Sequence, residues 1–145
     1  MDKEKGNNID AFSNFFDNFI KTGVLHREFT ITDDFKLKLK VLNSEETSVA
    51  EAMFTADNPM LSDTGYLRLR SAAMIAMATV AINGIPFEEG STPIGGISQA
   101  RYSLYGYYLK MPTEVMATVW DCYLEIAEDQ KEKYSGNAVE DVKNS

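Results

Sequence analysis

Residues 64–83 constrain the fold of this chain more than any other stretch, because they read as one long helix with almost no polar side after its first two turns. The pair Asn83-Gly84 is a helix stop signal, since both residues tolerate a left-handed backbone, and Pro86 cannot continue the helix. A helix that is apolar around most of its circumference must be enclosed by other elements. We therefore expect a buried central helix that ends at Asn83. Its apolar side chains are Tyr66, Leu67, Leu69, Ala72, Ala73, Met74, Ile75, Ala76, Met77, Ala78, Val80, Ala81 and Ile82.

The same helix is too short to cross a membrane. Its densest apolar run, residues 72–82, is about half of the roughly 20 residues that are needed to span the hydrocarbon layer. We therefore expect a core helix and a protein without membrane association.

Length and composition predict one compact domain. A chain of 145 residues with 44% hydrophobic side chains can bury a sizeable core. We expect a single globular domain over residues 9–134, flanked by a mobile N-terminus at residues 1–8 and a mobile C-terminal tail at residues 135–145. The expected fold is α+β and predominantly helical, with a small antiparallel β-hairpin and about five helices around the central buried helix.

Charge and cysteine content restrict the partners and the compartment. The formal net charge of −8 opposes nucleic-acid binding, which needs a basic face. The single cysteine, Cys122, cannot form an intrachain disulfide, and residues 1–6 lack the apolar core of a secretory signal. The sequence therefore predicts a protein that folds in a cytoplasm and binds no nucleic acid.

An amphipathic helix is expected over residues 9–20. Its apolar side chains recur at three- and four-residue steps, and they include the phenylalanines Phe12, Phe15, Phe16 and Phe19. One interpretation is a helix that docks on the core of its own chain. The other is a detachable recognition helix that lies in a groove of a partner, since so many phenylalanines on a short segment exceed what a surface arm needs. The sequence leaves both interpretations open.

The clearest strand covers residues 35–41, where apolar side chains alternate with a row of lysines. We pair this strand back onto residues 25–31 through a three-residue loop at residues 32–34. That register sets Phe29 against Leu37 and leaves Arg27 on the wrong face. The lysine row is typical of a solvated sheet face or of protection against edge pairing, and an acidic-partner site is the alternative.

A helix start follows the strand directly. Ser44 precedes two acidic residues in what would be the first turn. In the central helix that comes next, Arg68 and Arg70 lie just before the apolar run. We expect ion pairs with acids of the preceding helix, although two arginines can also clamp a phosphate or a carboxylate.

Residues 84–96 are the one long irregular connection and the most loop-like functional candidate. A helical hairpin is expected after it, over residues 97–111 and 114–134. Its clustered tyrosines and its tryptophan suit a core and also suit protein interfaces, so we expect most in the core and one or two on a contact surface. The candidate partner-binding residues of the whole chain are Phe12, Phe15, Phe16, Phe19, Phe87, Tyr105, Tyr108 and Trp120.

No catalytic, cofactor-binding or metal-binding residues are predicted. His26 is the only histidine, so neither a histidine metal cluster nor a Ser-His-Asp triad can be built. Cys122 lies on an apolar helix face, which favours a small buried side chain over a nucleophile. Three acidic pairs are adjacent in the sequence, and adjacent residues on a helix do not converge on one substrate. They are Glu45-Glu46, Glu88-Glu89 and Glu128-Asp129. We expect a protein that is not an enzyme and holds no cofactor.

The order of elements is similar to that of a known family. The chain combines a strand that ends in FKLKLKVLNSEET, the long helix AMIAMATVAINGIPF and the late segment YYLKMPTEVMATVWDCYLEIAEDQKE. With these motifs, roughly residues 25–133 resemble the small tail assembly chaperones and baseplate hub assembly proteins of tailed bacteriophages. The phenylalanine-rich N-terminal helix lies outside this family pattern.

The resemblance implies a non-catalytic assembly chaperone or adaptor that binds another phage tail or baseplate protein in the host cytoplasm. A minor structural component of the tail or baseplate, retained in the virion, is the alternative within the same class. A small acidic inhibitor of a host enzyme is the alternative of another class. Whether the chain forms a homo-oligomer stays open.

Overall fold

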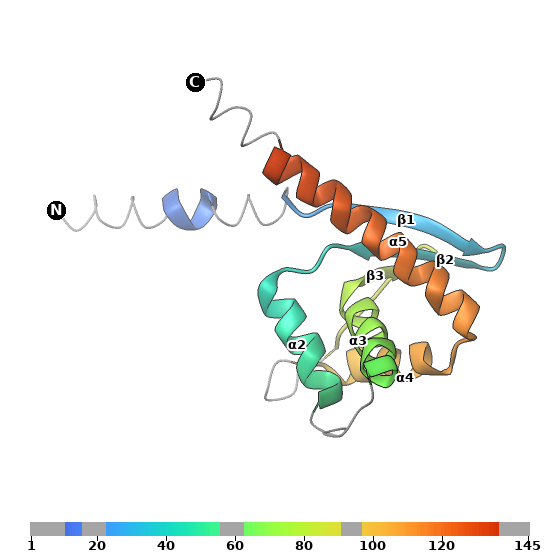
Figure 1. Ribbon diagram of the computed structural model, residues 1–145. Coiled ribbons are helices and arrows are strands. Elements are labelled where there is room, and N and C mark those ends of the chain that lie inside the picture. Colours follow the sequence, from blue (N-terminus) through green and yellow to red (C-terminus); the bar gives the residue numbers. More distant parts are fainter. Residues whose placement is uncertain (1–10, 16–22, 56–62, 91–96, 137–145) are drawn as a thin grey trace.

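The computed structural model describes residues 11–15, 23–55, 63–90 and 97–136 (Figure 1). These residues form an α+β fold that is predominantly helical, which confirms the predicted fold class. The predicted mobile ends, residues 1–8 and most of 135–145, lie outside the described residues. The elements are β1 (His26–Thr32), β2 (Phe35–Lys40), α2 (Ser44–Thr55), α3 (Asp63–Ala78), β3 (Thr79–Ile82), β4 (Ile85–Pro86), α4 (Gln99–Lys110), α5 (Thr113–Lys131) and the π-helical turn η1 (Glu132–Gly136).

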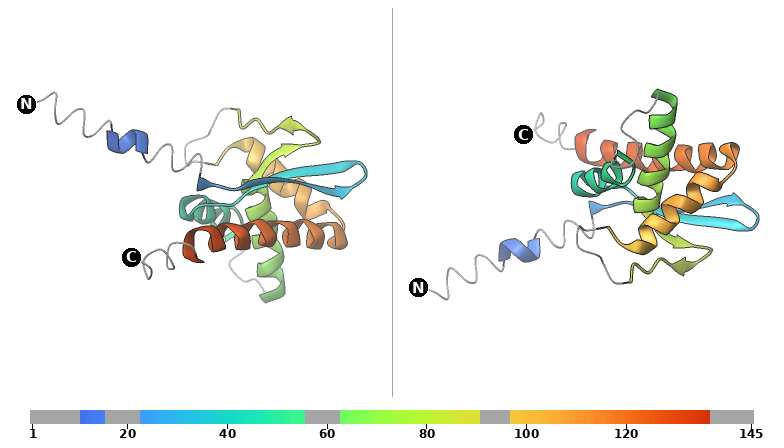
Figure 2. Two further views of the ribbon diagram at one scale, coloured as in Figure 1. Left: turned by 90° about the horizontal axis from the view of Figure 1, so that it is seen from above. Right: turned by 90° about the horizontal axis from the view of Figure 1, so that it is seen from below.

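The strands form one antiparallel sheet in the order β1-β2-β3-β4, with the helices on one side of it (Figure 2). On β2, Leu37 and Leu39 are fully buried under the helices, while Lys36 is exposed on the other face. The predicted lone hairpin is therefore only half of the sheet.

The first hairpin has the predicted register but a different loop. Phe29 lies opposite Leu37, as expected. Thr32 pairs with Phe35, which leaves a two-residue turn at residues 33–34, and the register shifts between Thr30 and Thr32. The predicted three-residue loop is therefore wrong. A β-bulge takes up the extra residue, so that a tight turn still keeps the apolar side chains on one face.

The central helix ends earlier than the sequence predicts. It ends at Ala78, and residues 79–82 continue as strand β3, so the predicted helix end at Asn83 is wrong. Asn83 and Gly84 do adopt positive φ angles, of 52° and 79°, but they form the turn between β3 and β4. Two adjacent left-handed residues suit a two-residue hairpin turn as well as a helix end, and the preceding β-branched side chains favour a strand.

Asn83 also ties the second hairpin to the first one. Its side-chain Oδ1 accepts a hydrogen bond from the backbone N–H of Lys36 at 2.7 Å, and its Nδ2 donates to the carbonyl of Asp34 at 3.1 Å. One side chain thus supplies partners for backbone groups next to the turn of the first hairpin.

The predicted central burial is confirmed for the second half of α3. The helix packs against α2 and α4, and its buried side chains include several alanines that allow close approach. Its first turns differ from the prediction, because Tyr66 and Leu67 are exposed. The buried residues of α3 are Ala72, Ala73, Met74, Ile75, Ala76 and Ala78.

Helix α2 begins with reciprocal capping bonds. The Asn43 side chain accepts from the backbone N–H of Glu46 at 2.8 Å, and the Glu46 side chain accepts from the N–H of Asn43 at 3.1 Å. Farther along, Glu51 lies 3.8 Å from Arg70 of α3, which confirms the predicted ion pair for that arginine.

The inward orientation of Arg27 has a structural reason. Its guanidinium meets α5, where Nη2 donates to Asp129 at 2.8 Å and Nη1 lies 3.5 Å from Glu125. A basic side chain among apolar neighbours on β1 therefore pairs with acidic residues of the helix that crosses the sheet.

The turn between β3 and β4 yields a test by matched glycine substitutions. Gly84→Ala is expected to lower the free energy of unfolding by about 1–3 kcal/mol, because a side chain strains a backbone with φ of 79° even though no atom lies within 4 Å of the new Cβ. Gly106→Ala is the control. Its Cβ also meets nothing within 4 Å, but it lies inside α4, so it should raise stability by about 0.5–1 kcal/mol. Urea unfolding measures both, and equal effects of the two changes would contradict the hairpin assignment.

Candidate functional site

The exposed phenylalanines of the N-terminal segment are the first candidate. Residues 11–15 are helical, and they lie away from the folded body in every view (Figures 1 and 2). Phe12 is 68% exposed and Phe15 is 62% exposed. Phe16 and Phe19 lie outside the described residues. Exposing large aromatic rings to water costs free energy. Protein interfaces use such rings as anchors because each ring buries much area.

The other candidate residues lie on different segments of the fold. Phe87 is partly buried beneath the guanidinium of Arg101, whose Cζ lies 4.0 Å from the ring centroid. Trp120 stacks on Tyr123 of the same helix, with ring centroids 5.4 Å apart. Tyr105 is partly buried against the core.

Tyr108 is a core residue, with 1% of its surface exposed. A contact with a partner is therefore incompatible with its position in this fold. Of the tyrosines on α4, the exposed ones are Tyr102 and Tyr107, which the sequence did not single out.

A buried polar cluster joins the end of α3 to α4. Arg101 is only 8% exposed, and its Nη1 donates to the carbonyls of Ala76 and Thr79, each at 2.7 Å. Its Nε donates to Glu89 at 2.8 Å. The last carbonyls of a helix lack intrahelical partners, so a cation at this point satisfies them and complements the helix dipole. Arg101 thereby stabilises the junction between helix α3 and strand β3.

Tyr108 extends this cluster. The Thr79 hydroxyl donates to the carbonyl of Ile75 at 2.7 Å, and it lies 2.8 Å from the Tyr108 hydroxyl. Since the threonine proton is already used, Tyr108 is the donor of that second bond. Burial raises the pKa of Tyr108 to about 12, against a smaller opposing effect of the charge of Arg101. The tyrosine is therefore held neutral, as a structural donor.

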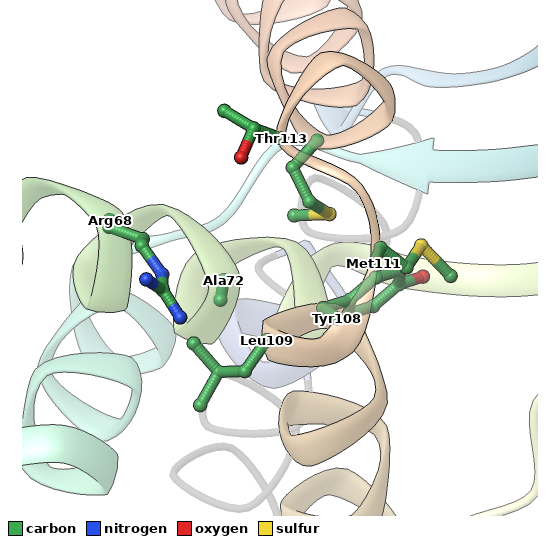
Figure 3. Close-up of a pocket in the computed structure, with 7 residues that line it drawn as sticks. Arg68, Ala72, Tyr108, Leu109, Met111 and Thr113 are labelled. Carbon is green, nitrogen blue, oxygen red and sulfur yellow. The ribbon is translucent and has the colours of Figure 1, made fainter.

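A cavity of about 160 Å³ lies between α3, α4 and the start of α5 (Figure 3). Figure 3 shows Arg68 pointing from α3 towards Leu109 of α4. Its wall is more apolar than polar, and Arg68 is the only charged side chain among the described residues that line it. The lining residues are Arg68, Ala72, Tyr108, Leu109, Met111, Thr113 and Met116.

The remaining reactive side chains do not assemble into a centre within the part of the chain that the structure describes. No group of three or more metal-ligating side chains occurs among these residues. Burial, followed by the charges of Lys38 and Lys40, lowers the pKa of His26. Burial also raises the pKa of Cys122, which packs against the core and stays a thiol.

Sequence reasoning missed both Arg101 and the cavity. A signal for Arg101 was present, because it precedes the buried Leu104 by three residues and the buried Tyr108 by seven, and therefore lies on the inward face of its helix. No comparable signal exists for the cavity, whose walls come from segments far apart in the sequence.

Comparisons with known proteins do not identify a family for this chain. No model of a known protein family matches the chain, and no curated protein or solved structure matches it significantly. Within the described residues, no helix is long and apolar enough to cross a membrane.

Proposed function

We propose that this protein is a non-catalytic, protein-binding assembly chaperone or adaptor of a tailed-bacteriophage tail or baseplate. The observation that carries the proposal is the pair of exposed rings, Phe12 and Phe15, on a helical segment apart from the folded body. An amphipathic helix of this kind binds by laying its apolar face into a hydrophobic groove. The sequence resemblance supplies the class of partner, another tail or baseplate protein.

The fold supports separate roles for the folded body and for the N-terminal helical segment. The described body buries its core with helices on one side of the sheet (Figure 2). On β2, Lys36, Lys38 and Lys40 alternate with the inward-facing apolar side chains and therefore belong to the opposite face. A stable body that displays an aromatic helix can hold an aggregation-prone surface of another chain until assembly, because the helix covers apolar area that would otherwise self-associate.

The test is affinity capture from cells that produce the phage encoding this protein. We expect the tagged full chain to retain a tail or baseplate protein, and Phe12→Ala/Phe15→Ala to reduce the captured amount at least tenfold, since each ring contributes an anchor. Tyr107→Ala is the matched control. Its ring is 64% exposed on α4, outside the proposed binding helix, and its removal should leave capture unchanged.

Two further experiments separate the alternatives. Recovery of the chain in purified particles would identify a structural component of the virion. Capture of a host enzyme in the absence of other phage proteins would identify an inhibitor. A folded bait that retains no tail or baseplate protein would contradict the proposal.

A further inference from the structure

The cavity beside Arg68 has the size and lining of a receptor for one aromatic ring. Its volume of about 160 Å³ is close to the roughly 150 Å³ of an engineered apolar cavity that binds benzene. The side chains of Leu109, Met111 and Met116 give it apolar walls, and methionine adapts its shape to what it contacts. Arg68 and Thr113 are exposed, so the cavity reaches the surface.

Arg68 adds a charge requirement to this receptor. Arg70, two residues along, pairs with Glu51, but no ion pair of Arg68 with another described residue occurs. A guanidinium at the wall of an apolar cavity attracts a carboxylate next to the group that fills the cavity. The chemistry that fits is therefore an aromatic side chain with an acidic neighbour.

The chain itself carries a segment with this chemistry. Phe12 and Phe15 are exposed on a helical segment, and residues 7–20 contain Asp10 and Asp17 but no lysine or arginine. Phe12 does not fill the cavity of its own chain, because it is 68% exposed. One molecule thus holds an apolar cavity with a cation and a separate aromatic helix with acids.

We propose that the cavity binds a phenylalanine of residues 11–15 from a second copy of the chain. Two copies that exchange these segments bury both aromatic helices through one two-fold interface, in which each supplies the same helix and the same cavity. The dimer uses the same two rings as the proposed partner contact, Phe12 and Phe15, so the two contacts compete for them. The dimer is tested on the purified chain alone, and either proposal can therefore fail without the other.

Sedimentation of the purified full chain over a range of concentrations tests this proposal. We expect a reversible dimer. Phe12→Ala/Phe15→Ala should raise the dimer dissociation constant at least tenfold, and Arg68→Glu should weaken it by a similar factor. Tyr107→Ala serves as the control and should leave the dimer unchanged. A chain that stays monomeric at all concentrations would overturn the proposal.

Mixing the two variants adds a test that misfolding cannot mimic. The Phe12→Ala/Phe15→Ala chain keeps its cavity, and the Arg68→Glu chain keeps its aromatic helix, so a mixture restores one complete contact. We expect dimers in the mixture at concentrations where each variant alone is monomeric. Failure to restore them, with both variants folded, would count against the exchange.

Methyl NMR locates the contact. A synthetic peptide of residues 7–20 is titrated into the full-length Phe12→Ala/Phe15→Ala variant, and saturable shifts of the Met111 and Met116 methyl signals are expected. No response of these methyls would exclude the cavity as the receptor. In the wild type, a filled cavity that does not depend on protein concentration would show that the chain's own segment is the occupant, and would overturn the second copy.

Discussion

Replacing Arg101 by methionine is expected to lower the free energy of unfolding by about 3–5 kcal/mol. The guanidinium supplies the hydrogen bonds to the carbonyls of Ala76 and Thr79 and is 8% exposed. Methionine fills similar space without donating, so these acceptors lose their charged partner inside the protein. Urea unfolding monitored by circular dichroism measures the loss.

Glu89→Gln is the control for Arg101. Glu89 accepts the third hydrogen bond of the arginine, but its side chain is half-exposed. We expect a cost below about 1 kcal/mol, since ion pairs with exposed partners contribute little. If Arg101→Met cost no more than Glu89→Gln, the contacts with the end of α3 would have no special weight.

Elements with strong local signals could be predicted from the sequence. The alternation of apolar side chains with lysines correctly predicted strand β2, and the acidic residues after Ser44 correctly predicted the start of helix α2. The Pro112 break separated α4 from α5 in the same way. These signals work because capping bonds and side-chain periodicity depend on residues within a few positions of one another.

The change from α3 to β3 could not be resolved by the same reasoning. Residues 79–82 are apolar on nearly all sides, and such a run fits a buried helix and a central strand equally well. Contacts with other elements determine that the helix ends at Ala78 and a strand begins. Residues 79–82 pair with the edge of β2, with Leu37 opposite Ile82, and Arg101 donates to carbonyls that lack a partner at the helix end. The Asn83-Gly84 pair, read as a hairpin turn, and the β-branched side chains before it were the local hints.

The candidate site was predictable only in part. The apolar pattern of residues 9–20 identified the phenylalanines, and the structure describes Phe12 and Phe15 as exposed. Tyr108 was chosen as a contact residue because tyrosine is amphipathic, yet its hydroxyl finds a partner in Thr79 and its ring goes to the core. A sequence does not show whether a tyrosine will find such a partner, because Thr79 is supplied by another element.

Tyr108 makes the folded state sensitive to alkali. Burial raises its pKa from 10.0 to about 12 in the folded state. Below pH 10 both states hold the proton, so stability does not depend on this group. As the pH rises further, the unfolded chain releases the proton while the folded chain keeps it, and stability falls by at most about 1.4 kcal/mol per pH unit. About 2 kcal/mol should therefore be lost between pH 10 and pH 12.

Tyr108→Phe isolates this effect. At pH 8 the variant should be less stable than the wild type by about 1 kcal/mol, because the bond to Thr79 is lost. Since phenylalanine has no proton to release, this difference should shrink above pH 10 and reverse in sign by pH 12. Urea unfolding of both proteins at pH 8, 10, 11 and 12 provides the comparison, with Tyr107→Phe as an exposed control whose difference stays constant. A constant difference for Tyr108→Phe would mean that its hydroxyl is as accessible to water in the folded chain as in the unfolded one.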